Sequence, residues 1–271
     1  MKLYIHSGLH KTATTSFQAF CSINQSELID VGLYYPKWKR SDQHSWILHE
    51  YQKEGIAIIE NYFDSIHREA TINKSNSVLL SGEDFENCIV DIGLAKKIES
   101  AADKAGFDSV TWIVVTRDQD ELIKSLYAEL SKQSVLINLD IINKSTAERG
   151  CFYVSSELYN YIFVTDFFRF EDEFNQNISG NCICIKYSDF IESFAGKTLL
   201  EHILTESQFL ELMKLVKIDR NPLNKKMSSI NIQTHYLFTG LDIGKPSRIS
   251  KLIMLPLILF RVLVQKIRHN S

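Results

Sequence analysis

The sequence lacks the features that mark disulfide-rich, membrane-spanning or repetitive proteins. Its five cysteines are odd in number and scattered along the chain, so they suggest no disulfide framework and favour a reducing compartment. The longest apolar stretch, residues 252–264, contains a proline and an arginine and is shorter than the ~20 residues of a spanning helix. No internal repeat, low-complexity tract or secretory leader is visible. We therefore expect a cytoplasmic protein.

The chain also lacks an excess of basic charge. Thirty lysines and arginines against thirty-three aspartates and glutamates give a net charge of −3, which argues against a protein that binds nucleic acid through a basic surface. At 271 residues, with 45% hydrophobic and 23% charged side chains, the chain is long enough to bury a large core. This composition excludes disorder, collagen and coiled coil as descriptions of the whole chain.

Short apolar segments alternate with longer amphipathic ones. We expect extended segments at residues 2–5, 33–36, 78–80, 110–115 and 182–186, with helices between them. Such alternation predicts a three-layer α/β fold, in which a central parallel sheet lies between helices. The polar stretch 138–152 is interpreted as a lid or substrate loop, and residues 155–175 as a long aromatic helix.

Parallel sheets of this kind bind ligands at the carboxyl ends of their strands. Three turns follow predicted strands and are therefore candidate sites: residues 8–16, 81–85 and 117–127. The first of them reads Gly8-Leu9-His10-Lys11-Thr12-Ala13-Thr14-Thr15-Ser16. A glycine, a lysine and several hydroxyl residues at the start of a helix form a phosphate cradle, because the backbone N–H groups and the helix dipole attract an anion.

This turn is not a Walker A loop. Only two residues separate Gly8 from Lys11, and no glycine precedes the lysine. Residues 11–16 instead resemble the phosphosulfate-binding loop of the sulfotransferases that use 3′-phosphoadenosine 5′-phosphosulfate (PAPS), which reads roughly K-T-[GA]-T-T/S-[ST]. Those enzymes also carry an arginine at the end of a central strand and a serine eight residues later, as Arg117 and Ser125 stand here.

The resemblance implies a P-loop NTPase-like sulfotransferase fold, PAPS as the donor, adenosine 3′,5′-bisphosphate (PAP) as the product, and no metal. It implies that Arg117 and Ser125 grip the 3′-phosphate. A weaker match over residues 219–228, to the C-terminal segment of bacterial members, adds Lys225, which would close over the nucleotide. The implied nucleotide contacts in the first turn are Gly8, His10, Lys11, Thr12, Ala13, Thr14, Thr15 and Ser16.

The same resemblance implies a bacterial enzyme that sulfates a carbohydrate or glycolipid. Lys11 would stabilise the leaving phosphate oxygen, and the acceptor hydroxyl or amine would need a general base. Glu83, which follows a predicted strand, is favoured for that role, and His44, which precedes a predicted helix, is its rival. Aromatic residues such as Trp46 and the tyrosines of 153–161 could stack on sugars or simply fill the core.

Two other functions remain open. A kinase-like enzyme acting on ATP would need Mg²⁺ ligands, and we find no apolar strand that ends in the required aspartate. A non-catalytic relative could keep the fold for nucleotide or glycan binding, although the intact set of Lys11, Arg117 and Ser125 speaks against it. A short basic run, Lys37, Lys39 and Arg40, could face an acidic glycan, but such runs are usually solvated turns.

The end of the chain lacks acidic side chains altogether. From Ile243 to Ser271 there are six basic residues and no acidic one, so this segment carries +6 and the rest of the chain carries −9. We therefore predict a single catalytic domain over residues 1–242 and a basic, apolar tail over 243–271. Residues 249–268 can lie on the inner face of an anionic membrane, meet a partner subunit, or pack on the domain.

Overall fold

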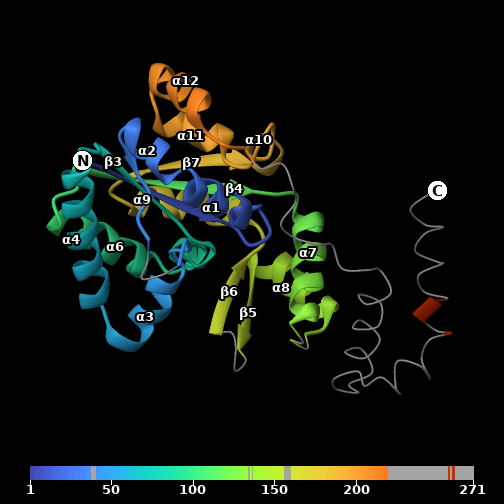
Figure 1. The fold of residues 1–271 in the computed structure, drawn as a ribbon. Coiled ribbons are helices and arrows are strands. Elements are labelled where there is room, and N and C mark those ends of the chain that lie inside the picture. Colours follow the sequence, from blue (N-terminus) through green and yellow to red (C-terminus); the bar gives the residue numbers. More distant parts are fainter. Residues whose placement is uncertain are drawn as a thin grey trace.

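The fold is built on a five-stranded parallel sheet, ordered β2-β3-β1-β4-β7 (Figure 1). This is a computed structural model, which describes residues 1–37, 41–133, 135, 137–155, 160–218, 256, 258 and 259. The strands are β1 (Lys2–Gly8), β2 (Leu33–Tyr34), β3 (Ser77–Ser81), β4 (Ser109–Thr116) and β7 (Asn181–Lys186). Every neighbouring pair in this sheet runs parallel. The predicted strands and the predicted parallel sheet are confirmed.

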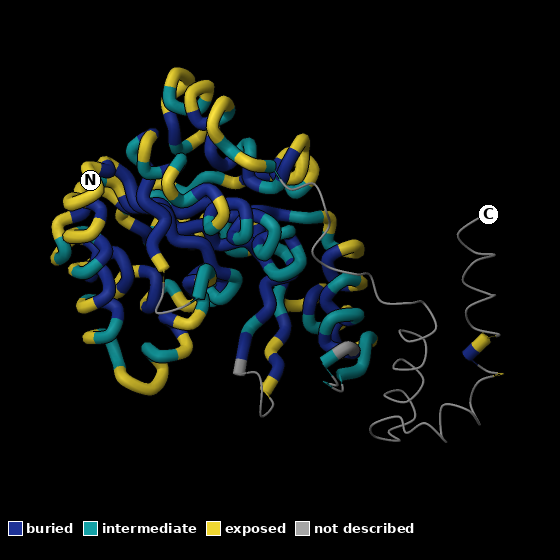
Figure 2. Tube along the Cα trace, viewed as in Figure 1, coloured by how far each residue is buried: buried dark blue, intermediate teal, exposed yellow. Residues whose placement is uncertain are grey.

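The central strands β1, β3 and β4 are buried on both faces of the sheet, and Figure 2 shows them as the buried interior of the fold. Because successive strand residues point to opposite faces, Ile5 and Trp112 enter one hydrophobic cluster, whereas Tyr4 and Ile113 enter the other. The first cluster is completed by α3 (Trp46–Glu54), α4 (Ala57–Ile72), α5 (Asn87–Val90), α6 (Ile92–Lys104), α7 (Gln119–Lys132) and α9 (Glu171–Asn177). The second is completed by α1 (Thr14–Ile23), α2 (Gln25–Asp30), α10 (Tyr187–Phe190), α11 (Lys197–Ile203) and α12 (Glu206–Leu215). The three-layer α/β fold is thus confirmed.

Two helices, α6 and α7, begin where the sequence provides a capping side chain. Asp118 accepts the backbone N–H of Glu121 at the start of α7, and Asp91 accepts that of Leu94 at the start of α6. A carboxylate at this position satisfies an N–H group that has no partner inside the helix. These caps fix the direction in which α6 and α7 leave the sheet.

The interpretation of residues 138–175 was wrong in two places. The expected lid is an ordinary helix, α8 (Leu139–Arg149), which is capped by the side chain of Asn138 and ends at Gly150. The expected long helix is replaced by η2 (Phe167–Arg169), α9 and a two-stranded antiparallel hairpin of β5 (Cys151–Ser155) and β6 (Asn160–Val164). Buried and exposed residues alternate along β5, a period of two that is typical of a strand, and residues 160–164 of the expected helix pair with it as β6.

The predictions made for the C-terminal part of the chain lie outside the described residues. These are the contact from Lys225, the match over 219–228 and almost all of the tail over 243–271. Among the helices that are described, none combines the length and the apolar character needed to cross a bilayer.

Candidate active site

The three predicted turns meet at one edge of the sheet. β1, β3 and β4 are parallel neighbours, so their carboxyl ends lie together. Arg117 Nη1, after β4, donates to the carbonyl of Lys11, after β1, at 3.0 Å. The backbone N–H of His10 donates to Glu86 Oε2, in η1 (Glu83–Glu86) after β3, at 3.2 Å. The site therefore combines all three turns, as the sequence predicted.

The loop after β1 has the backbone shape of an anion cradle. Lys11 and Ala13 have φ values of 67° and 64°, in the left-handed region that non-glycine residues rarely adopt. Ala13 is the N-cap of α1, and in the described part of the chain no side chain caps this helix and no acidic residue stands in its first turn. The first N–H groups of α1 lack intrahelical acceptors, so they can bind an anion.

Two features of the residues that pack beneath this loop fit a bound phosphate group. The hydroxyl oxygen of Thr14 is buried and has no hydrogen-bond partner among the described residues. A Cβ on Gly8 would lie 2.4 Å from Thr14 Oγ1 and 3.0 Å from both Thr12 Oγ1 and His6 Nε2, so only glycine lets the chain pass this closely. Thr12 donates to the carbonyl of Leu9, which closes the turn. The residues present thus suit the phosphate groups of the nucleotide that the sequence resemblance implies.

Each of the two cations at this loop is paired with a carboxylate of α7. Lys11 Nζ lies 3.4 Å from Glu129 Oε2, and Arg117 Nη2 lies 3.1 Å from Glu121 Oε2. The guanidinium of Arg117 also stacks on the ring of Tyr187, 4.6 Å from its centroid. Glu121, Ser125 and Glu129 are spaced four residues apart, so they follow one stripe of α7. An anion that binds Lys11 and Arg117 must compete with two resident carboxylates.

We expect Glu129→Gln to bind PAP about two- to fivefold more tightly than the wild type, since a partly exposed ion pair of this kind contributes roughly 0.2–1 kcal/mol. The glutamine keeps the shape of the side chain but no longer neutralises Lys11. Isothermal titration of the full chain with PAP measures the change.

A matched control is Glu201→Gln, which removes a carboxylate 2.7 Å from Lys197 in α11, far along the chain from the loop. It should leave PAP affinity unchanged. Weaker binding by Glu129→Gln would contradict the competition and would mean that Glu129 orients Lys11 for the ligand.

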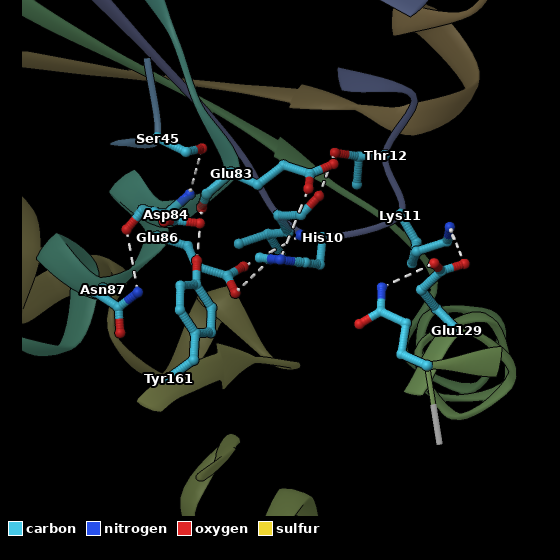
Figure 3. Close-up of polar contacts among 12 residues, drawn as sticks. His10, Lys11, Thr12, Ser45, Glu83, Asp84, Glu86, Asn87, Glu129 and Tyr161 are labelled. Atoms are coloured by element: carbon cyan, nitrogen blue, oxygen red, sulfur yellow. Dashed lines mark hydrogen bonds and ion pairs between the residues drawn. The ribbon is translucent and has the colours of Figure 1, made fainter. Parts of the chain in front are cut away.

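His10 is held between the carboxylates of Glu86 and Glu83 (Figure 3). Its Nδ1–H donates to Glu86 Oε1 at 3.0 Å, and its Nε2 lies 3.6 Å from Glu83 Oε2. Burial by itself lowers the pKa of His10, but the charges of Glu86 and Glu83 outweigh it and raise that pKa to about 9. The imidazolium therefore bridges the two carboxylates and fixes Glu83. This arrangement differs from the nucleotide contact that the resemblance implied for His10.

Asp84 is a further titratable group that the sequence did not single out. Burial raises its pKa to about 7, with the charges of Glu83 and Glu86 adding to the shift and His10 opposing it. Its backbone N–H donates to Ser45 Oγ at 3.3 Å. A carboxyl group that titrates near neutrality is well suited to proton transfer. Asp84 is therefore a rival to Glu83 as the general base.

His44, by contrast, does not fit the role of base. It is fully buried; the backbone N–H of Ser81 donates to its Nδ1 at 2.9 Å, and its Nε2–H donates to the carbonyl of Pro36 at 2.8 Å. Burial lowers its pKa to about 4, so the ring is neutral. Because both ring nitrogens are occupied, His44 is a structural residue that ties the segment before α3 to the end of β3.

Glu83 lies where two cavities meet. A small cavity of about 140 Å³ is lined by Lys11 and Thr15 of the loop and by residues of α7. A larger one of about 870 Å³ opens toward α3 and the β5–β6 hairpin. His10, Glu83 and Gln133 line both. A carboxylate at this junction can touch groups held in either cavity, with its side chain 31% exposed.

Several residues that build the site were missed at the sequence level. His6, Glu86 and Glu129 carry no motif, and each enters the site through a contact distant in sequence. Tyr161, one of the tyrosines considered for stacking on sugars, donates its hydroxyl to the carbonyl of Glu83 at 2.9 Å. Pairs separated by 75 residues or more, such as His6 Nδ1 with Ser81 Oγ at 2.9 Å, leave no local pattern. Within the described ranges no cluster of His, Cys, Asp and Glu is arranged to hold a metal ion.

Comparison with known proteins gives little further information. No family model and no curated protein matches the chain. The chain is similar to one crystal structure, a sulfotransferase from Alicyclobacillus acidocaldarius, with a TM-score of 0.45 and 10% sequence identity over 89% of this chain and 92% of that one. A likeness this distant assigns no activity.

Proposed function

We propose that the protein is a sulfotransferase that moves a sulfuryl group from PAPS to a hydroxyl, or amine, of a carbohydrate or glycolipid. The observation that carries this proposal is the arrangement of Glu83 between two cavities. On one side of Glu83 lies the loop after β1, whose backbone can bind a phosphate group and which Lys11 and Arg117 flank. On the other side lies a cavity of about 870 Å³. The loop sequence of residues 11–16 and the pair Arg117 and Ser125 support PAPS as the donor.

When bound, PAPS supplies a sulfuryl group attached to a phosphate that can leave. The N–H groups at the start of α1 and the hydroxyl of Thr14 would hold that phosphate. The ammonium of Lys11 would balance the negative charge that develops on the phosphate oxygen as its bond to sulfur breaks. Glu83 would accept the proton of the acceptor hydroxyl while the acceptor oxygen forms its bond to sulfur.

His10 supports Glu83 without touching the reacting atoms. Its imidazolium lies between Glu83 and Glu86, so it keeps the Glu83 carboxylate oriented before the acceptor arrives. On this proposal His10 is a positioning residue.

A thermal-shift comparison of PAP with ATP and Mg²⁺ tests the donor. We expect PAP at ~100 times its Kd to stabilise the fold by about 2.7 kcal/mol, which raises Tm by roughly 5–10 °C in a chain of this size. ATP with Mg²⁺ should give a smaller shift, because the loop lacks the Walker A pattern. A larger shift with ATP and Mg²⁺ would favour a kinase-like enzyme instead.

A sulfate-transfer screen over glycans then tests the activity. Transfer to at least one glycan is expected once PAP binding is established. PAP binding without transfer to any member of a broad panel would favour a non-catalytic relative.

A further inference from the structure

The large cavity beside Glu83 is built from aromatic and amide side chains. Trp46 of α3 and Tyr153 of β5 line it from different elements, and they are 52% and 57% exposed, respectively. Their exposed rings are available to stack on a ligand held in the cavity. Gln43, Gln52 and Asn87 add amide groups to the lining. Aromatic faces combined with amides suit a ring that carries hydroxyl groups.

Acidic side chains outnumber basic ones in the lining of this cavity. Glu83, Asp84 and Asp91 line it, and no lysine or arginine is among its lining residues in the described chain. The imidazolium of His10 is already shared by two carboxylates. The described residue of the predicted basic run, Lys37, lies 3.8 Å from Asp42 and is not part of the lining. Lys39 and Arg40 of that run lie outside the described residues, so the expectation of an acidic glycan there stays a prediction.

We propose that the acceptor is a hydroxyl-rich sugar without anionic groups, and that the cavity rejects its own sulfated product. This inference rests on the proposed function. Sulfuryl transfer replaces a neutral hydroxyl by a sulfate ester that carries one negative charge. The same carboxylates that tolerate the substrate then repel the product, so they speed its release and oppose a second sulfation of the same sugar.

The size of this discrimination follows from Coulomb's law. A carboxylate about 6 Å from an anionic ligand in water weakens its binding by roughly threefold, so two such groups together give about tenfold and three give about thirtyfold. Added salt screens charges in an open cavity, so the discrimination should shrink as the ionic strength rises.

Direct binding to the full chain, without donor, tests the proposal. The probes are neutral disaccharides, each matched with its amino, uronic acid and sulfated counterparts, and binding is measured by saturation-transfer NMR. At 20 mM salt we expect the neutral and amino forms to bind at least about tenfold more tightly than their anionic matches, and this ratio should fall at 0.5 M salt. Equal or tighter binding by an anionic match overturns the proposal, and so does a panel in which no neutral sugar binds.

The substitution Asp91→Asn removes the negative charge of this side chain but keeps its size and shape, so it tests whether charge causes the discrimination. The Asp91 side chain accepts the N–H of Leu94 at 3.0 Å, and asparagine caps a helix equally well. The ratio between neutral and anionic sugars should fall by about threefold. Asp103→Asn, at the opposite end of α6 and outside the cavity lining, should leave the ratio unchanged. An unchanged ratio in Asp91→Asn rejects the electrostatic explanation.

The two proposals fail separately. A missing Tm shift with PAP would reject the sulfotransferase while the sugar-binding measurement still reports on the cavity. A normal PAP shift with preferred binding of anionic sugars would reject the acceptor class alone.

Discussion

Lys11→Ala is expected to lower kcat for sulfuryl transfer by about a hundredfold to a thousandfold, the range found when one charge-stabilising donor is removed from a transition state. Lys11 follows His10 in the cradle and lines the small cavity next to Glu83, so its ammonium is the cation best placed for the leaving phosphate oxygen. Steady-state kinetics with saturating PAPS measures the loss. Turnover within a few-fold of the wild type would rule out this role.

Alanine can adopt the left-handed backbone of Lys11 at a cost similar to that of lysine, so the variant should fold. A Tm close to that of the wild type confirms this. Lys214→Ala, which truncates an exposed lysine of α12, is the matched control and should keep full activity.

Glu83→Gln is expected to lower kcat by more than a hundredfold, because general-base catalysis contributes about 10²–10⁴ in rate. The glutamine preserves the size of the side chain but cannot accept the acceptor proton. Because Glu83 is exposed at the junction of two cavities, the substitution should leave Tm nearly unchanged. Steady-state rates with a reactive glycan and PAPS measure the effect.

Two comparison variants show whether Glu83 is the base. Asp84→Asn should have a much smaller effect on kcat, since Asp84 lines the large cavity but not the small one that holds Lys11. A hundredfold loss in Asp84→Asn with an active Glu83→Gln would reverse the assignment. His44→Ala should instead destabilise the fold, because it leaves buried partners such as the Ser81 N–H unsatisfied at about 1–3 kcal/mol each.

The sheet could be predicted because its longer strands have local sequence patterns of apolar and β-branched residues. Residues 110–115 are apolar and β-branched, as strands buried on both faces usually are. The hairpin of β5 and β6 could not be predicted in the same way. Tyr153 is exposed while Phe152 and Phe163 stack face to face with centroids 5.1 Å apart, and such cross-strand pairing is decided by contacts that a single segment does not reveal.

Some residues of the site could likewise be predicted from the sequence, and others could not. Lys11 and Arg117 follow predicted strands, so their meeting at one sheet edge could be predicted from topology alone. The roles of His10 and His44 could not, because they depend on which groups surround each ring. His10 meets Glu83 and Glu86 and becomes a cation, whereas His44 meets a backbone carbonyl and an N–H and stays neutral.

The two cavities at Glu83 belong to different parts of the chain. The small one draws on the loop after β1, on α7 and on Phe163 of β6, and the large one on α3, η1 and the β5–β6 hairpin, with three residues in common. Substitutions at hairpin positions that line only the large cavity, such as Tyr153, can therefore reshape that cavity without disturbing the other. In evolutionary terms, a chain built this way can change the shape of its large cavity by drift at those positions while selection on the loop after β1 stays constant.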